Sequence, residues 1–339
     1  MKNGLLVYST NRENNLFNIG DYIQSIAARQ FFKNQIDLFI NRENLNENFD
    51  SDIKIILNGW YMHEGKNWPP HEKIHPLFIS FHINKLVYPY FSSEKSINYF
   101  KKYEPIGCRD QSSVNFLKSN GIDAYFSGCL TLTLGESYKN NGDGKDIIFV
   151  DPCTEKDVNL TTIIKTFKNL IKNFSKIVKL NKKKGLKFGI KNLLHTTFFY
   201  ETYAQLCSDD VLLNAQYINH LLEDHFVNDE DKFSYAESLL KQYSTAKYVV
   251  TSRIHCALPC VAMNTPVLYI HDTRSSDIST CRLDGILDLL NVIEYQPGKI
   301  DTHKFFNERL TQNSTFLNPN KHIEIVKRLV ETAKDFVSK

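Results

Sequence analysis

The 339-residue chain lacks any apolar run close to the roughly 20 residues that cross a bilayer. Its first residues carry one lysine and a very short apolar stretch, so we expect a strand there and not a signal peptide. A net charge of only +3 gives no whole-molecule reason to expect nucleic-acid binding. We therefore expect a cytoplasmic protein with no integral membrane segment and no nucleic-acid partner.

Cysteine pairs at metal-binding spacing are also absent. The seven cysteines are scattered, odd in number and mostly set in apolar segments, as buried free thiols in a reducing compartment would be. Cys256 and Cys260 are four residues apart beside His255, but no C-x-x-C pair completes a structural zinc site. We expect no metal at this position.

No low-complexity linker divides the chain, although its length exceeds one ordinary core and fits two domains. The Asn-, Gly- and Asp-rich segment 139–145 is the best boundary. Short β-rich runs alternate with helical runs on both sides of it, which predicts two parallel-sheet α/β layers. We expect domains over 1–140 and 145–320, with a C-terminal helix over 321–337 packed back on the first.

Hydrophobic periodicity places the individual elements. It predicts strands over 4–8, 53–57, 77–81, 105–108, 124–126, 146–150, 211–218, 247–251 and 267–270, with Asn58-Gly59 as a turn signal. It predicts helices over 21–32, 112–120, 233–243 and 256–263, and a helical region over about 160–206.

The sharpest local pattern is the strand over 247–251, which ends in Thr-Ser-Arg directly before a helix. Ser252 is expected near the N-cap of that helix, beside free backbone N–H groups and the positive end of the helix dipole. Arg253 adds a guanidinium that suits phosphate or carboxylate. A surface ion pair for Arg253 and a satisfied core position for His255 are equally compatible with these residues.

A second strand, over 105–108, also ends in an arginine before a helix. Ligands in parallel α/β folds lie beyond the carboxyl ends of the strands, and two domains place the site in the cleft between them. Arg109 would then face Arg253 across the cleft. A surface cap formed by Arg109 and Asp110 is an equally good interpretation.

Two further motifs follow predicted strands. In Asn18-Ile19-Gly20-Asp21, Gly20 allows a turn that brings a helix start close to a ligand, and Asp21 would cap that helix. One glycine is not a dinucleotide fingerprint. The segment from Asn58 to His63 carries Gly59 and Trp60, and the Trp60 ring suits a sugar or a core position equally well.

Together these motifs resemble the polysaccharide pyruvyltransferase family. The matching segments occur in the order Asn18-Ile19-Gly20-Asp21, Asn58-Gly59-Trp60, Gly107-Cys108-Arg109-Asp110, Ser127-Gly128-Cys129-Leu130-Thr131-Leu132 and Thr251-Ser252-Arg253-Ile254-His255. The resemblance extends to about Ile270, and its most specific part is the Arg-Ile-His element. The segment 181–226 matches least, and no role is carried over to it.

The resemblance implies two Rossmann-like domains facing across a cleft, as in GT-B glycosyltransferases. It implies transfer of the enolpyruvyl unit of phosphoenolpyruvate to two hydroxyls of a surface-polysaccharide sugar, without a metal or cofactor. By the same resemblance Arg253 and Arg109 would bind the donor beside Ser252 and Ile254, and His255 would be the essential histidine. The acceptor side would be lined by Asn18, Gly20, Asp21, Asn58, Gly59, Trp60 and His63.

Phosphoenolpyruvate carries two anionic groups around an enol carbon, so two arginines suit it chemically. His255 is the candidate general acid, and Asp21 or His63 the candidate base for the sugar hydroxyl. The sequence leaves open the oligomeric state and whether the acceptor is a lipid-linked oligosaccharide, a nucleotide sugar or a polymer. A lipid-linked acceptor would bring the protein to the inner face of the cytoplasmic membrane, where Lys182-Lys183-Lys184 would help; a solvated helix face explains these lysines equally.

Two other functions fit the same residues. A nucleotide-sugar glycosyltransferase of similar shape would also bind phosphate at the helix after the 247–251 strand, and would need an acid for the ribose, for which Asp272 and Asp277 are available. A non-catalytic sugar- or anion-binding module is the third alternative.

Overall fold

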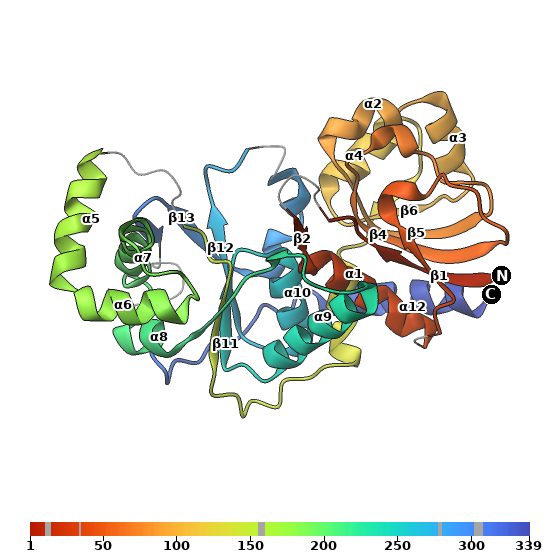
Figure 1. Cartoon of the computed structure of the whole chain (residues 1–339). Coiled ribbons are helices and arrows are strands. Elements are labelled where there is room, and N and C mark those ends of the chain that lie inside the picture. The colour runs from red at the N-terminus through yellow and green to blue at the C-terminus, as the bar shows by residue number, and fades with distance from the viewer. Residues whose placement is uncertain (11–14, 34, 155–159, 277–279, 302–307) are drawn as a thin grey trace.

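The computed structural model describes all residues except 11–14, 34, 155–159, 277–279 and 302–307. Figure 1 shows an elongated molecule in which two sheets lie side by side with helices around them, and the two ends of the chain lie close together beside the first sheet. The mixed α/β class with parallel sheets, expected from the alternating periodicity, is confirmed.

The first sheet contains six parallel strands in the spatial order β3-β1-β4-β5-β6-β7. Their bounds are β1 (Lys2–Val7), β3 (Leu38–Asn41), β4 (Ile53–Tyr61), β5 (Ile74–Ile83), β6 (Ile106–Cys108) and β7 (Ala124–Phe126). Around it lie α1 (Ile19–Arg29), α2 (Tyr88–Phe91), α3 (Glu94–Lys101), α4 (Gln111–Ser119) and the 3-10 helices η1 (Gln30–Phe32) and η5 (Leu130–Glu136).

The second sheet has the order β14-β13-β12-β11-β8-β9. Its strands are β8 (Ile147–Val150), β9 (Gln216–Ile218), β11 (Tyr248–Thr251), β12 (Val267–Asp272), β13 (Asn291–Gln296) and β14 (Lys299–Asp301), the last antiparallel to β13. Its helices are α5 (Leu160–Lys172), α6 (Phe174–Lys183), α7 (Ile190–Tyr203), α8 (Asp209–Asn214), α9 (Asp229–Ser244) and α10 (Ile254–Met263).

Both sheets follow one topology. When each sheet's strands are numbered along the chain, both have the spatial order 2-1-3-4-5-6. In doubly wound sheets of this order the ligand crevice lies at the carboxyl ends of the first and third strands, where the order reverses. Those strands are β1 and β4 in the first sheet and β8 and β11 in the second.

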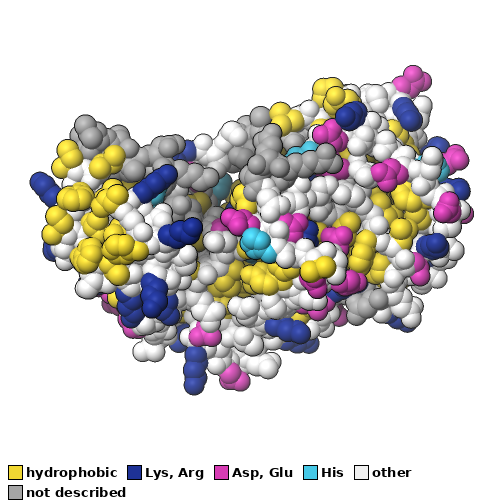
Figure 2. Space-filling view, viewed as in Figure 1, with side chains coloured by type: hydrophobic (Ala, Val, Ile, Leu, Met, Phe, Trp, Pro, Cys, Tyr) yellow, Lys and Arg dark blue, Asp and Glu magenta, His cyan; other side chains and the backbone are white. Residues whose placement is uncertain are grey.

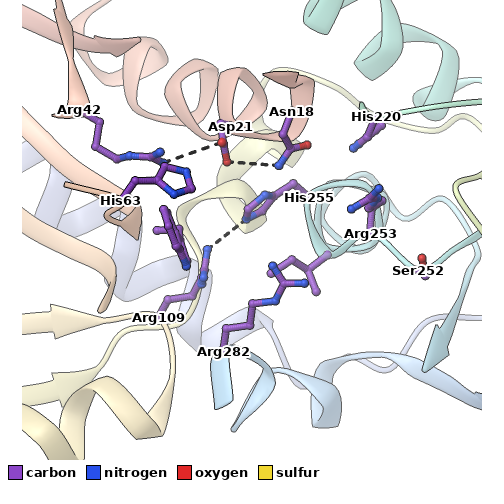
Figure 3. A pocket seen from close by; sticks show the side chains of 12 residues that line it. Asn18, Asp21, Arg42, His63, Arg109, His220, Ser252, Arg253, His255 and Arg282 are labelled. Carbon is purple, nitrogen blue, oxygen red and sulfur yellow. Dashed lines mark hydrogen bonds and ion pairs between the residues drawn. The ribbon is translucent and has the colours of Figure 1, made fainter. Parts of the chain in front are cut away.

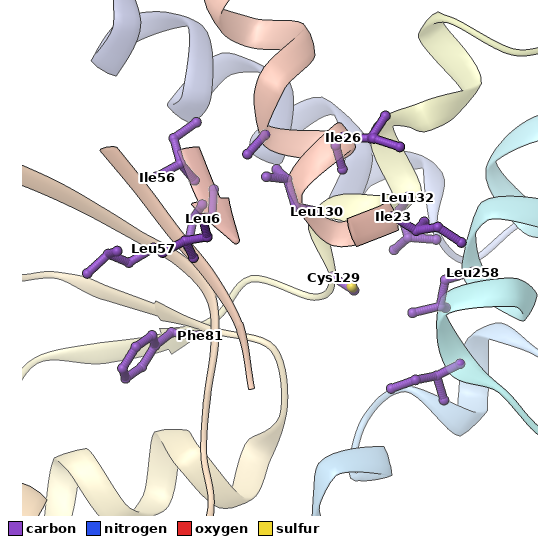
Figure 4. Close-up of a cluster of buried hydrophobic side chains, with 14 of the residues drawn as sticks. Leu6, Ile23, Ile26, Ile56, Leu57, Phe81, Cys129, Leu130, Leu132 and Leu258 are labelled. Atoms are coloured by element: carbon purple, nitrogen blue, oxygen red, sulfur yellow. The ribbon is translucent and has the colours of Figure 1, made fainter. Parts of the chain in front are cut away.

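The two halves share one buried core. The largest cluster of buried apolar side chains runs from the first sheet through α1 and η5 to α9 and α10 of the second half, as Figure 4 shows with Leu130, Leu132 and Leu258. Strands β2 (Leu16–Asn18) and β10 (Leu221–Glu223) add an antiparallel pair between the halves. A second cluster fills the far face of the second sheet, so both faces of β8 and β11 are buried.

The C-terminal helix, α12 (Ile323–Ser338), packs on the first half. Its Leu329 and Ala333 belong to the shared core, and the Lys54 ammonium of β4 donates to the Val337 carbonyl at 3.3 Å. The division into domains near 139–145 stays a prediction.

Two local predictions are wrong. Asn58-Gly59 does not end the strand but lies inside β4 beside a bulge of β5, where Ile79 and Ser80 stand opposite Asn58 and the register shifts. Gly59 has a positive φ of 107° at this point. The strand expected over 211–218 is mostly α8, and only β9 at its end is a strand. Ser208 caps α8 and two aspartates occupy its first turn, which favours a helix over the apolar run that follows.

Candidate active site

A cavity of about 220 Å³ lies between the two sheets, at the carboxyl ends of strands from both. Figure 3 shows its side chains converging from the two halves. The lining residues are Asn18, Asp21, Arg42, Trp60, His63, Arg109, His220, Ser252, Arg253, Ile254, His255 and Arg282. Nine of the sequence-predicted site residues are therefore brought together here; Gly20, Asn58 and Gly59 are not in the lining.

The N-terminus of α10 forms one wall. The helix begins at Ile254 and Arg253 is its N-cap residue, so Ser252 lies one residue before the expected cap position. Thr251 Oγ1 accepts from the Arg253 N–H at 2.9 Å, and Ser252 Oγ donates to the Asp151 carbonyl at 2.5 Å. No side chain caps α10, and the start of this helix lines the cavity. Its first backbone N–H groups can therefore bind an anion.

Among the described residues, a single carboxylate, that of Asp151, holds the Arg253 side chain. Its Nε donates to Asp151 Oδ2 at 2.8 Å, and the same oxygen accepts the His220 N–H at 2.9 Å. The Arg253 side chain is 37% exposed. An ion pair thus exists, as one interpretation of the sequence expected, but it lies in the cavity and orients the guanidinium while leaving its Nη groups to a ligand.

Arg109 is buried, with 1% of its surface exposed. Its Nη1 lies 3.2 Å from Gln24 Oε1 and 3.2 Å from His255 Nε2, and no carboxylate of the described residues pairs with it. Asp110 instead caps α4 through the Ser113 N–H at 2.9 Å. Of the interpretation of Arg109 and Asp110 as a surface cap, the cap is confirmed for Asp110, but the surface position is wrong because both residues are buried.

His255 links the two halves of the cavity. Because arginine can only donate, the contact with Arg109 makes Nε2 of His255 the acceptor and assigns the ring proton to Nδ1. Burial, and then the positive charge of Arg109, hold the pKa of His255 well below its ordinary value. The ligand-free cavity therefore contains a neutral His255. A Cβ on Gly20 would lie 3.2 Å from His255 Cβ, so the glycine allows α1 to approach α10 this closely.

Asp21 projects into the cavity from the first turn of α1 and does not cap that helix. The cap is Asn18, whose Oδ1 accepts from the Gly20 N–H at 3.1 Å. Asp21 Oδ1 accepts from Gln24 Nε2 at 3.0 Å, and Arg42 Nη1 lies 3.9 Å from Oδ2. Burial raises the pKa of the Asp21 carboxyl, although Arg42 opposes this shift.

An aromatic surface lies beside Asp21. The guanidinium carbon of Arg42 lies 5.1 Å from the centre of the Trp60 ring and 4.9 Å from that of Tyr8. The rings of Trp60 and His63 are 4.5 Å apart between centres. Trp60 is therefore partly exposed in the cavity and not a core residue.

Asn58 and Gly59 act behind the lining. Asn58 Nδ2 donates to the Gln24 carbonyl at 2.8 Å, and a Cβ on Gly59 would lie 3.0 Å from Gln24 Oε1. Both residues hold Gln24, which in turn holds Arg109. Neither residue is among those that line the cavity.

Three lining residues were not predicted: Arg42, His220 and Arg282. His220 donates or accepts through Nε2 at 2.8 Å from the Tyr243 hydroxyl, while its buried Nδ1 has no partner in the part of the chain that is described. Burial lowers the pKa of His220 to about 3. Arg282 carries a buried Nε, likewise without a described partner, and burial followed by Arg109 lowers the pKa of its guanidinium.

The cavity is consequently rich in uncompensated positive charge. Arg109 and Arg282 have no carboxylate partner among the described residues, and the helix start adds partial positive charge. Buried charges without partners are costly, so this cavity favours an anionic ligand. The described residues contain no group of three His, Cys, Asp or Glu side chains placed to hold a metal ion.

The fold and cavity define an α/β protein with a positively charged cavity between two mainly parallel sheets. The sequence profile described as polysaccharide pyruvyl transferase matches residues 18–271, and the chain belongs to that family. The family recognised from the five motifs is thereby confirmed, and with it a transferase linked to polysaccharides.

A search of curated proteins finds no match to the chain. Among solved structures, the chain is similar to a functionally uncharacterized protein from Klebsiella pneumoniae subsp. pneumoniae NTUH-K2044, with 12% identity and a TM-score of 0.41. The match covers 86% of this chain and 93% of the other. A similarity of this size carries no argument about function.

Proposed function

We propose that the protein is a ketal pyruvyltransferase that uses phosphoenolpyruvate as donor and forms a cyclic pyruvate ketal on two hydroxyls of one sugar residue. The observation that supports this most directly is the convergence of Arg109, Arg253 and Arg282 on the uncapped start of α10 beside His255. We also propose that the sheets represent two Rossmann-like domains of GT-B-like architecture and that the protein acts in the cytoplasm without a metal or cofactor.

The charge of the cavity matches the donor. Phosphoenolpyruvate has a phosphate and a carboxylate on the same carbon, so it needs cations on two sides. Arg253 offers an oriented pair of Nη groups, and Arg109 offers a charge that no described carboxylate neutralises. One anionic group would occupy the start of α10 with Arg253, and the other would lie toward Arg109 and Arg282.

His255 would supply the proton. Burial, and then the charges of Arg109 and the other arginines, lower the pKa of His255. The two negative groups of the donor would offset the arginine charges and raise this pKa, so that His255 takes up a proton when the donor binds. It then transfers that proton to the methylene carbon of the donor. One sugar hydroxyl adds to the adjacent carbon and loses its proton to a base. The second hydroxyl then attacks the same carbon, the bond from that carbon to the phosphate oxygen breaks, and the proton of this hydroxyl returns to His255. Inorganic phosphate leaves and the ketal ring is closed.

Asp21 is the better placed of the two candidate bases. It lies in the same cavity as His255, and its raised pKa makes it a stronger proton acceptor than an ordinary aspartate. The neighbouring Trp60 ring offers an apolar face for the acceptor sugar. His63 contacts Trp60 and would shape the acceptor side.

Isothermal titration of phosphoenolpyruvate into the wild-type protein and into Arg253→Ala, without added metal, tests the donor. We expect binding to the wild type that is lost in the variant. Phosphate release that requires a sugar with two suitably spaced hydroxyls would establish the reaction. Absence of binding, repeated in the presence of candidate acceptors, would refute the donor assignment.

A nucleotide-sugar glycosyltransferase is the competing proposal. Of its two candidate acids, Asp272 is bound by the Arg274 guanidinium at 2.9 Å and does not line the cavity, and Asp277 lies outside the described residues. Thermal shift in the presence of a nucleotide sugar or of phosphoenolpyruvate separates the two proposals, because a ligand stabilises only the protein that binds it.

A further inference from the structure

One segment of the chain is strongly basic. Residues 160–200 contain ten lysines and neither arginine nor an acidic residue. The chain has 41 basic and 38 acidic residues, so 31 basic residues remain against 38 acidic ones elsewhere. The net charge of +3 thus conceals a cationic segment on an otherwise acidic protein. The lysines are Lys165, Lys168, Lys172, Lys176, Lys179, Lys182, Lys183, Lys184, Lys187 and Lys191.

Most of these charges are not neutralised in the fold. They lie on α5, α6, the connection after α6 and the start of α7, at the end of the molecule farthest from the first sheet (Figure 1). Lys176 pairs with Asp209 at 2.6 Å, and Lys184 lies 3.9 Å above the Phe199 ring, where burial lowers its pKa to about 8. The other eight have no carboxylate partner in the described part of the chain.

The same helices expose large apolar side chains. Ile164, Phe167 and Ile171 of α5 are 54%, 46% and 65% exposed, and their spacing of three and four residues places them on one face. Phe174, at the start of α6, is 50% exposed. A neighbouring face of α5 is buried through Thr166 and Leu170. Figure 2 shows hydrophobic side chains gathered at the left edge, where α5 and α6 lie, with Lys and Arg side chains beside them.

We name Ile164, Phe167, Ile171 and Phe174 the apolar stripe. Lys165, Lys168 and Lys172 lie along one flank of it on the helix. A helix with an apolar face next to a lysine-rich face lies in the plane of a membrane surface, with the apolar side chains in the headgroup region and the lysines on anionic headgroups. No helix among the described residues is long and apolar enough to span a bilayer.

We propose that α5 and the start of α6 dock the protein on an anionic lipid surface. The lysines alone would suit any polyanion, but the apolar stripe gains free energy only where it leaves water, which a lipid surface allows and a dissolved polyanion does not. None of these residues lines the cavity. The inference therefore goes beyond the proposed function and does not depend on it.

Vesicle co-sedimentation of the full chain tests this docking. Vesicles of equal parts phosphatidylglycerol and phosphatidylcholine should bind the wild type, and vesicles of phosphatidylcholine alone should bind it far less. Because each lysine at an anionic surface strengthens binding about fivefold, K165Q/K168Q/K172Q should weaken it on the order of a hundredfold. I164S/F167S/I171S should reduce binding to the anionic vesicles strongly, and what remains should disappear in high salt.

Two matched variants serve as controls. K95Q/K101Q/K118Q removes three exposed lysines from the first half, and L86S/V227S/L317S removes three exposed apolar side chains elsewhere. Both should bind vesicles as the wild type does. Circular dichroism and phosphoenolpyruvate binding should be unchanged in all four variants, so loss of docking is distinguished from misfolding and from failure of the proposed function.

Three results would overturn the proposal. One is a wild type that does not bind the anionic vesicles. The second is equal loss of binding in the control variants, which would make the effect one of overall charge or hydrophobicity. The third is an I164S/F167S/I171S variant that changes the oligomeric state but binds vesicles normally, which would assign the apolar stripe to a contact between protein chains.

Discussion

The two sheets share a strand order but hold their cavity arginines in different ways. Arg109, after β6 of the first sheet, is buried and has no carboxylate partner among the described residues. Arg253, after β11 of the second, is partly exposed and bound to Asp151. Burying the charge of Arg109 costs free energy that a bound anion would offset. The charge of Arg253 is already compensated by Asp151, which also orients its guanidinium. Residue type therefore does not set the energetic role of an arginine; burial and partner do.

The largest expected effect is at the residue between the two arginines. His255→Ala should lower turnover about a hundred- to ten-thousandfold, because it removes the proposed proton donor. Circular dichroism should show an intact fold. His225→Ala, which changes an exposed histidine outside the cavity, is the control and should keep wild-type turnover. Near-normal turnover in His255→Ala would assign the proton transfer to another residue.

Arg253→Lys tests whether the donor needs the bidentate geometry of the Arg253 guanidinium. Lysine keeps the charge but cannot hold Asp151 and a bidentate anion together, so most activity should be lost. Donor affinity should fall about ten- to a hundredfold, the value of one or two charge-assisted hydrogen bonds. Titration calorimetry measures it, and the thermal stability of the ligand-free protein should change little. An unchanged dissociation constant would mean that Arg253 does not bind the donor.

Arg109→Gln tests the uncompensated charge. Removing a buried charge without a carboxylate partner should raise the free energy of unfolding by about 1–4 kcal/mol, while the stabilisation by phosphoenolpyruvate should vanish. Urea denaturation with and without the donor measures both. Arg253→Gln, which releases Asp151 from an existing pair, should not stabilise the protein. Equal destabilisation of both variants would refute the claim that the charge of Arg109 is uncompensated while that of Arg253 is compensated.

The smallest expected effect concerns the buried histidines. The pKa of His220 falls to about 3 in the folded protein from 6.5, so below pH 6.5 the unfolded chain binds a proton that the folded protein does not. Its contribution to stability is thus complete above pH 6.5 and is lost as the pH falls toward 3. Between pH 7 and 5, His220→Gln should lose about 1–2 kcal/mol less stability than the wild type in urea denaturation. Equal losses would show that His220 does not titrate this way.

Sequence predicted the parts of the site that follow buried strands. The runs that became β6 and β11 are short and apolar, and each ends in an arginine before a helix, so position made Arg109, Arg253 and His255 candidates. Position alone did not exclude a surface ion pair, a surface cap or a core histidine. The family motifs then linked the two segments. The prediction of a turn at Asn58-Gly59 was wrong, because a glycine with positive φ occurs at bulges as well as in turns.

The remaining lining residues carry no local signal. His220 lies in the segment that matches the family least, Arg282 lies beyond the end of the resemblance, and Arg42 belongs to none of the motifs. The fold brings them to the cavity through the contact of β2 with β10 and the packing of the two halves. Whole-chain charge likewise hid the lysine-rich segment, because the acidic residues that balance it lie elsewhere in the sequence.

The core that joins the two halves has a consequence for how the chain can be divided. The segment 139–145 is mostly exposed, whereas α10 and η5 on either side of it bury each other, and α12 returns to the first half. Fragments separated between Asn141 and Gly142 would each present an apolar surface that the other covers. We expect the two pieces, expressed together, to assemble by complementation, and neither alone to possess the site.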